Sequence, residues 1–402
     1  MGLLDRLLGR LTPETLAQEL IGLLRASGEN RPMQYVPREN KIVIGTSKDS
    51  SVIGIGNLYA EYCAAPRAYR ADVLLRFARA QIQGGKKLPP FDEIKGMILP
   101  RIRERSYYES IKLKIGMNFP HQIIADDFAV GLAIDLPDAI RESDESQLKD
   151  WNLSLDDALA LARKNLWERS NEDFRQIQPG VYASPWKDNH DCSRVYLHDL
   201  IWQLKVKGAH VAMIPNRDTL LVTGADDEAG LSKIAQMTED AMDQPRFMSA
   251  FALKLNDRKW EPFQPPADHP SHDAFAMLAI KTRILEYENQ GAALKEKFKK
   301  EGNDIFVSKY SGLARKDGTV YSMSVWTKGV TAVLPKTDWI YFYDPDLGRE
   351  QSEVADASWE RVMSVAGNLM KPLGLYPERF KISEFPSPTQ IQQLGKNSEP
   401  KY

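Results

Sequence analysis

The sequence predicts an α+β protein in which short antiparallel hairpins are covered by helices, arranged as two or three related α-β-β-α modules. The main observation is a cassette of an apolar residue, a proline, an Asn or Asp three positions later, and a β-rich run. It occurs at residues 36–44, 214–222 and 334–342. Proline fixes φ, Asn and Asp favour turns, and β-branched and aromatic residues favour strands. Each cassette therefore predicts a strand, a turn and a returning strand.

Composition is that of an ordinary folded protein. Hydrophobic residues make up 43% of the 402 residues, and 53 basic side chains balance 55 acidic ones. This balance gives no general reason to expect nucleic-acid or membrane partners. Cys63 and Cys192 are the only cysteines, which argues against a disulfide framework and favours a reducing compartment. We therefore expect a cytoplasmic protein of two or three domains.

The first predicted domain is an α+β module at residues 1–84. Its leading segment, Met1–Leu11, has the leucine spacing of an amphipathic helix, which favours docking on protein and leaves peripheral membrane association as an alternative. Thr12 and Pro13 form a helix start. The first cassette, a β-like run at 51–55 and a helix at 71–82 complete the module. The glycines, lysines and prolines at 84–90 indicate a linker.

The second predicted domain spans residues 91–263. Its clearest helices are expected at 155–167, 194–206 and 228–242, and a β-like run is expected at 247–255. The proline-rich stretch at 264–270 predicts a boundary.

The third predicted domain, residues 271–385, is a long helix followed by a four-stranded meander and a second helix. The helix is expected at 273–300, and Lys316-Asp317-Gly318 predicts a hairpin turn between the first two strands. The covering helix is expected at 352–370. The tail at 386–402 is polar and contains proline, which predicts disorder. The four β-like runs of the meander are 304–314, 319–326, 330–334 and 339–343.

Several short segments between residues 31 and 263 occur in a specific order. They are Leu99-Pro100-Arg101-Ile102-Arg103, Asp126-Asp127, Leu132–Leu136, Asn165-Leu166, Asp191-Cys192-Ser193-Arg194, residues 214–222, and Asn256 with Trp260-Glu261-Pro262. In these segments the chain resembles the YtpQ-like family of uncharacterised bacterial proteins. The family is defined by sequence and has no known activity, so the resemblance implies no catalytic residues. The resemblance does not extend to the third domain.

The residues His190, Cys192 and His198, with the carboxylate of Asp199, could contribute to a metal site, because imidazole, thiolate and carboxylate are all zinc ligands. Their spacing matches no standard zinc motif. The alternative, which we favour, is that Asp191 or Ser193 caps the following helix and Cys192 packs in the core. No nucleotide-binding glycine motif is complete, so no cofactor is expected.

Clustered charges provide two further hypotheses. Asp126-Asp127 with Asp135 could hold a divalent cation, although a solvated turn is the favoured interpretation. The basic stretch 95–114 carries Tyr107 and Tyr108 and could bind nucleic acid, but its alternation at 111–115 is typical of a half-exposed strand.

The leading functional hypothesis is a non-catalytic protein-binding or adaptor scaffold with an unidentified protein partner. One alternative is a hydrolase or nuclease in which Arg103, Asp126, Asp191 and Arg194 converge in the fold. The other is a peripheral membrane protein that uses Met1–Leu11. We expect the aromatic residues Trp326, Trp339 and 341–343 to pack in a core. An exposed interface is the second interpretation of these residues.

Overall fold

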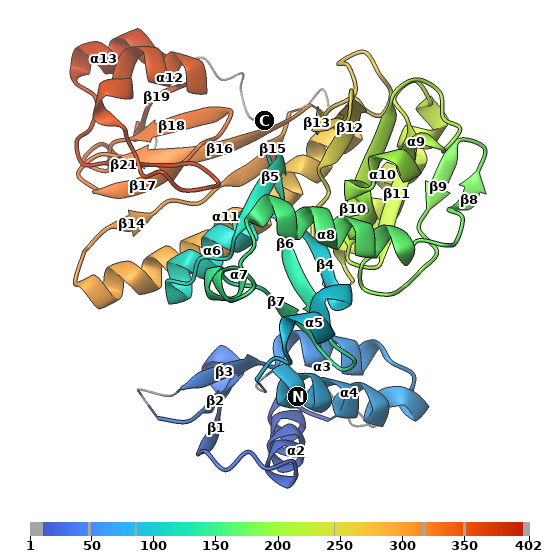
Figure 1. Ribbon diagram of the computed structural model, residues 1–402. Helices are drawn as coiled ribbons and strands as arrows, with labels where there is room; N and C mark the ends of the chain where they lie inside the picture. Colours follow the sequence, from blue (N-terminus) through green and yellow to red (C-terminus); the bar gives the residue numbers. More distant parts are fainter. Residues whose placement is uncertain are drawn as a thin grey trace. The chain divides into compact units, whose positions relative to one another are not determined.

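The computed structural model describes residues 11–46, 50–84, 87–244, 246–315, 319–348 and 351–396 (Figure 1). The fold is mixed α+β, as predicted, with several mostly antiparallel sheets. The chain divides into two compact units. The first contains Met1–Pro100, Leu132–Arg169 and Asp243–Phe247, and the second contains Arg101–Gly131, Ser170–Met242 and Met248–Tyr402. The division passes within strands β4 (Ile98–Glu104) and β6 (Phe128–Asp135), so it differs from the expected linkers at 84–90 and 264–270.

The first unit begins with helix α2 (Pro13–Ala26), whose first turn is capped by Thr12 Oγ1. Strands β1 (Met33–Val36), β2 (Lys41–Ile44) and β3 (Ser51–Gly54) form an antiparallel sheet, and helices α3 (Gly56–Ala64) and α4 (Arg70–Gly84) follow. The first cassette is therefore a hairpin, as predicted. Its Asn40 adopts a φ of 47°, which Asn tolerates better than most residues.

The rest of the first unit contains a short strand, β7 (Ile140–Glu142), and three helices, α5 (Phe91–Ile94), α7 (Glu145–Asp150) and α8 (Leu155–Glu168). Helix α8 confirms the predicted helix at 155–167. Its Asn165 side chain is buried. The amide Nδ2 donates to the carbonyls of Lys95 at 2.7 Å and Ile98 at 2.9 Å, so its hydrogen-bonding capacity is satisfied. Asn165 thus fixes the turn that leads into β4.

A six-stranded sheet with the order β13-β12-β10-β11-β9-β8 forms the middle of the second unit. The second cassette forms its central hairpin, as predicted, and helix α10 (Glu228–Met242) packs on β10 and β11. The expected strand at 247–255 begins only at Ala252. The strands are β8 (Arg175–Gln178), β9 (Val181–Ala183), β10 (His210–Asn216), β11 (Thr219–Gly224), β12 (Ala252–Asn256) and β13 (Lys259–Phe263).

Two local predictions in the second unit are wrong. The residues expected to form a strand at 111–115 belong to helix α6 (Arg105–Ile115), which ends at Gly116 with a φ of 72°. Helix α6 packs against helix α11 (His272–Glu301), and this tertiary contact outweighs a short alternating pattern. The helix expected at 194–206 is instead a 3₁₀ helix, η4 (Cys192–Tyr196), followed by the short helix α9 (His198–Trp202).

The predicted four-stranded meander is also wrong, because the C-terminal strands form two sheets. One has the order β15-β16-β18-β19 and the other β14-β17-β21-β20, and β16 and β18 are parallel. The expected hairpin between the first two runs is confirmed by β15 and β16, although its turn at 316–318 lies outside the described residues. The strands are β14 (Phe306–Val307), β15 (Ser311–Ala314), β16 (Val320–Thr327), β17 (Ala332–Pro335), β18 (Trp339–Tyr343), β19 (Glu353–Ser358), β20 (Lys371–Pro372) and β21 (Arg379–Ile382).

The third cassette is not a hairpin, because β17 and β18 belong to different sheets. Its Asp338 carboxylate accepts hydrogen bonds from Ser322 N at 2.7 Å and Ser322 Oγ at 2.8 Å. These bonds hold the chain after β17 against β16 instead of letting it return along β17. Because one cassette of three departs from the pattern, related repeat modules are not confirmed.

The C-terminal end is more ordered than expected. The predicted helix at 352–370 is strand β19 followed by helix α12 (Trp359–Ala366), which Ser358 caps. Helix α13 (Pro388–Leu394) begins with a capping box at Ser387, and its Leu394 is buried. The prediction of disorder is therefore wrong for 386–396, while 397–402 lie outside the described residues.

Candidate protein-binding surface

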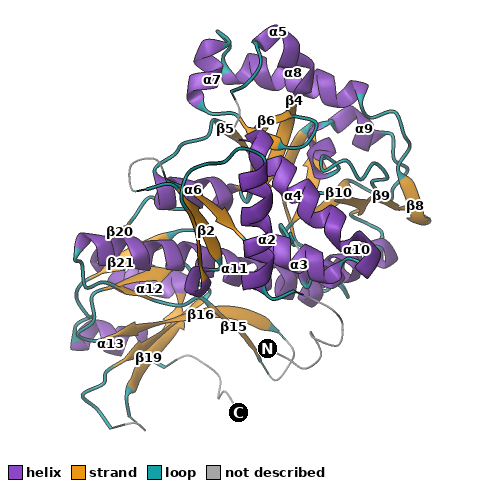
Figure 2. Ribbon diagram, turned by 90° about the horizontal axis from the view of Figure 1, so that it is seen from below, coloured by secondary structure: helices purple, strands orange, loops and turns teal. Residues whose placement is uncertain are grey.

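Strand β15 lies at one edge of the C-terminal sheet, next to β16 (Figure 2). Leu313 is paired with Tyr321 across the two strands. Within the described chain no strand pairs with the other side of β15. An edge strand presents N–H and C=O groups to any chain that approaches it in an extended conformation. Charged residues and proline are the usual features that block such pairing, and the four residues of β15 include neither.

The opposite edge of the same sheet is covered. Asp356 N in β19 donates to the carbonyl of Gly395 at 2.9 Å, and Asp356 forms a parallel bridge with Lys396. Helix α13 packs beside this strand. The two edges therefore differ, because the chain protects β19 with its own C-terminal residues.

Three other described edge strands carry protective features. Strand β13 contains Lys259 and Pro262, β20 contains Pro372, and β8 begins with Arg175 and has a register shift. Strands β1, β3 and β14 are exceptions, because they too are edge strands with neither a charge nor a proline. Of these, β3 has four residues like β15, and its Val52 is 57% exposed. Strand β3 is thus the natural comparison for β15.

The face of the C-terminal sheet that lies opposite its core is aromatic and partly exposed. Trp326 and Phe342 face the core, whereas Leu313 and Val325 are 37% and 39% exposed. The hydroxyl groups of Tyr321 and Tyr341 form a hydrogen bond of 3.1 Å. Trp339 Nε1 donates to Asp356 Oδ1 at 2.9 Å. These bonds hold the aromatic rings of this face in fixed positions.

Positive charge adjoins the open edge. The guanidinium of Arg315 lies 4.9 Å from the centre of the Tyr321 ring and 6.0 Å from that of Trp339. Lys309 precedes the strand on its other side. The edge is thus an uncharged strand between two cationic residues.

Helix α11 packs against β15. A Cβ added at Gly312 would lie 2.6 Å from Ile280 Cγ2, so the backbone of β15 approaches α11 more closely than a side chain permits. This contact fixes the position of the strand. The open edge is therefore built on a rigid element.

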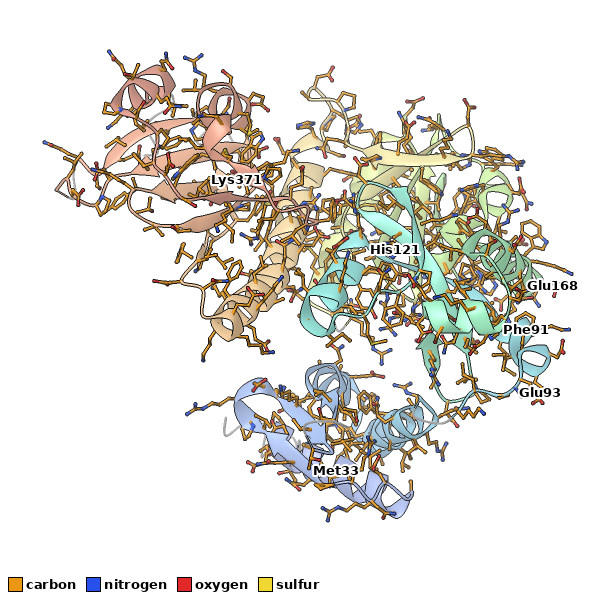
Figure 3. All side chains as sticks on the ribbon, turned by 60° about the vertical axis from the view of Figure 1, so that its left-hand side comes forward. Met33, Phe91, Glu93, His121, Glu168 and Lys371 are labelled. Carbon is orange, nitrogen blue, oxygen red and sulfur yellow. The ribbon has the colours of Figure 1, made fainter. Side chains whose placement is uncertain are left out.

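A buried polar network centres on Arg283 of α11. Arg283 donates from Nη2 to Asp127 at 2.6 Å, and from Nη1 to Glu286 at 2.7 Å and Tyr376 at 3.1 Å. Glu286 also accepts a hydrogen bond from Ser106 at 2.7 Å, and Tyr376 donates to Asp127. The network joins α6, the β5–β6 turn and the segment before β21 to α11, where β5 is His121–Ala125. His121, the first residue of β5, is labelled in Figure 3.

Burial strongly affects the ionisation of this network. It raises the pKa of Glu286 to about 7, against the opposing charge of Arg283. It also raises the pKa of Tyr376 above its ordinary value. The carboxylates of Glu286 and Asp127 keep Arg283 charged by raising its pKa, although burial acts to lower it.

The structure separates the two adjacent aspartates that were candidates for cation binding. Asp126 is exposed in the turn between β5 and β6, while Asp127 is buried against Arg283. Asp135 forms an ion pair with Arg169 at 2.7 Å. Asp126 thus fits the favoured expectation of a solvated turn, whereas Asp127 and Asp135 have cationic partners.

Arg194 and Asp191 organise the loop before η4. Arg194 is fully buried, donates to both carboxylate oxygens of Asp188 at 2.9 and 2.8 Å, and lies 3.9 Å from the Trp186 ring centre. Burial acts to raise the pKa of Asp188, but the hydrogen bonds and charge of Arg194 lower it overall. Asp191 accepts from Asp188 N at 3.2 Å and makes no cap bond to η4.

Arg103 is buried on β4. Its guanidinium lies 4.6 Å from the centre of the Tyr107 ring. Neighbouring Glu104 has a raised pKa because of burial, which outweighs the opposing charges of Arg103, Arg217 and Arg101. Glu104, Arg283 and Glu286 were not selected from the sequence. The i, i+3 spacing of Arg283 and Glu286 on a helix was the available signal.

The metal-site candidates occupy different environments. His190 and Cys192 are buried, and burial raises the pKa of the Cys192 thiol. His198 is half-buried beside Tyr196 and Trp260. Over the described ranges no three His, Cys, Asp or Glu residues lie where they could hold a metal ion. Cys192 packs in the core, as in the favoured interpretation.

Ser193 does not cap a helix. Its Oγ accepts a hydrogen bond from Ile102 N at 3.4 Å, and Cys192 N donates to the carbonyl of Arg217 at 3.1 Å. Trp260 Nε1 donates to Val195 O at 2.9 Å. Several segments on which the YtpQ-like resemblance rests therefore meet at η4.

No family model, curated protein or solved structure matches this chain. None of the helices in the described part of the chain is both long and apolar enough to cross a membrane. The amphipathic segment proposed at Met1–Leu11 lies outside the described residues except for Leu11, which packs against the core of the first unit.

Proposed function

We propose that this protein is a non-catalytic binding module that recognises an extended segment of a partner protein by adding it as a strand beside β15. The observation that carries the proposal is the unprotected edge of β15 in a sheet whose other edge the chain covers itself. Strand addition obtains affinity from main-chain hydrogen bonds and specificity from alternate side chains.

The surroundings of β15 support the same function. The exposed side chain of Leu313 offers apolar contact to the residue of an added strand that lies beside it on the same face of the sheet. Lys309 is exposed just before β15, so an acidic residue at that end of the partner segment would be favoured. The Gly312 contact with α11 holds the strand in place before binding, which reduces the entropic cost of association.

The test uses the full-length protein and a displayed library of random 12-residue peptides. Peptides selected on the native protein should bind at least 10-fold more weakly to Leu313→Lys, because a lysine on an edge strand opposes pairing. Val52→Lys, which makes the same change on the comparison strand β3, should leave their affinity unchanged. Hydrogen exchange should show that the bound peptide protects the amides of Gly312 and Ala314, which face the open edge because Arg315 N and its alternate residues bond to β16.

Peptide binding that survives Leu313→Lys, or that is lost in Val52→Lys instead, would refute the assignment to β15. Leu313→Ala serves as the matched control for folding, since it removes the apolar contact without adding charge. Circular dichroism of all three variants should match that of the native protein.

A hydrolase remains the second candidate, and the observation that favours it is Glu104 beside Arg101, Arg103 and Arg217. Carboxyl groups with a raised pKa near cations are typical of acid–base catalysis. Hydrolysis of a panel of ester and phosphodiester substrates, abolished by Glu104→Gln, would establish this activity. Absence of turnover in the native protein would reject the hydrolase and leave binding as the proposed function.

A further inference from the structure

The first unit contains an open pocket among helices α2, α3 and α4. Its volume is about 630 Å³, which falls within the range of small-molecule sites, roughly 300–1,000 Å³. Most of its lining is apolar. The apolar lining includes Leu23, Leu74 and Leu75.

Gly22 is an exposed residue of α2 and lines the pocket. The residue lies in the interior of α2, where glycine costs about 1 kcal/mol relative to alanine. A Cβ built on Gly22 meets no atom within 4 Å, so no close neighbour requires the glycine. The missing side chain instead leaves room in the pocket that α2 lines.

The polar groups of the pocket have an excess of positive charge. The lining contains two arginines, Arg67 and Arg70, and one carboxylate, that of Glu19. Arg70 is only 8% exposed, and its Nε donates to the carbonyl of Ala65 at 3.2 Å. The guanidinium of Arg70 lies 5.6 Å from the centre of the Tyr62 ring. A cation held in this way at an apolar pocket favours a ligand that combines an apolar chain with an anionic head.

We propose that this pocket binds a single-chain amphiphile with a carboxylate head, a medium-chain fatty acid being the simplest example. The chain packs against Leu23, Leu74 and Leu75, and the carboxylate lies at Arg67 and Arg70. The site belongs to the first unit and is independent of the protein-binding edge at β15.

The experiment is a calorimetric titration of the full-length protein with dodecanoate below its micellar concentration. Gly22→Leu places a side chain in the space beside α2 and should weaken binding at least 10-fold without lowering the melting temperature, because leucine favours helix. Gln18→Leu adds the same side chain to α2 outside the pocket lining and should bind like the native protein. Arg67→Glu should also weaken binding at least 10-fold.

Two further probes test the chemistry of the head group. Dodecyltrimethylammonium has the same chain with a cationic head and should bind at least 10-fold more weakly than dodecanoate. Phosphatidylglycerol vesicles test a membrane surface as the source of the anion. Binding to vesicles without binding to free dodecanoate would overturn the proposal.

Unchanged dodecanoate affinity in Gly22→Leu would also overturn the proposal, as would failure of the native protein to bind dodecanoate. If Gly22→Leu does not fold, Leu75→Trp provides a second obstruction. Leu75 lines the pocket and is 39% exposed, so a larger side chain is accommodated there without disturbing the core.

Discussion

Arg283 and Asp127 form a buried ion pair in which Nη2 donates to Oδ1 at 2.6 Å, although the two residues are 156 positions apart. The pair joins helix α11 to the β5–β6 turn. Removing one member leaves the other as an uncompensated charge in a poorly solvated place. The geometry therefore makes this pair a sensitive point of the second unit.

Arg283→Met should destabilise the second unit by about 3 kcal/mol, because it leaves the carboxylates of Asp127 and Glu286 without their cation. Chemical denaturation followed by circular dichroism measures the change. Asp126→Asn is the matched control, since Asp126 is exposed beside Asp127, and it should change stability by less than about 0.5 kcal/mol. Equal effects of the two substitutions would contradict the assignment.

Glu286 should make stability depend on pH. Burial raises its pKa from 4.5 to about 7 in the folded protein. Between these two values the folded state binds a proton that the unfolded state has lost, so the free energy of unfolding should fall as pH rises from about 4.5 to 7. The fall should total about 3 kcal/mol, at about 1.4 kcal/mol for each unit of pKa shift.

The matched variant for this pH dependence is Glu286→Gln, which keeps an oxygen acceptor for Ser106 and cannot ionise. Its denaturation midpoint should be nearly constant over the same pH range once the common background is subtracted. An identical slope in the native protein and in this variant would assign the pH dependence to other groups.

Gly312→Val should destabilise the protein by about 1–3 kcal/mol, because the added Cβ would lie 2.6 Å from Ile280 Cγ2 and would push β15 away from α11. Thermal denaturation measures the loss. Gly54→Ala provides a control on the uncharged edge strand β3, where a Cβ meets nothing within 4 Å, and it should be neutral or slightly stabilising. A neutral Gly312→Val would show that β15 does not need its close approach to α11.

Arg379→Met should lower the free energy of unfolding by at least about 3 kcal/mol. Arg379 is 2% exposed and donates to Gln290 Oε1 and to the carbonyls of Tyr287, Ser308 and Val333. Its removal takes a donor away from each of these oxygens, although Val333 O still accepts from Ser308 N at 3.1 Å. Each buried acceptor left unsatisfied costs roughly 1–3 kcal/mol. Lys381→Met, on the same strand at a half-exposed position, is the control and should change the denaturation midpoint little.

Local sequence features determined much of the secondary structure. Thr12 and Pro13 begin α2, the apolar periodicity at 155–167 and 228–242 produces α8 and α10, and the first two cassettes form hairpins. These features act between residues close in the chain, so capping groups, prolines and helical spacing are sufficient to predict them.

Tertiary contacts decided the rest. Asp338 bonds to Ser322 and so turns the third cassette into a crossing between sheets, and α6 becomes helical where it packs on α11. The open edge of β15 depends on which strand lies beside it, and the pocket at Gly22 depends on the packing of α2, α3 and α4. Strand order and buried ion pairs join residues far apart in the chain, and no local pattern in a single sequence specifies which distant partner each will find.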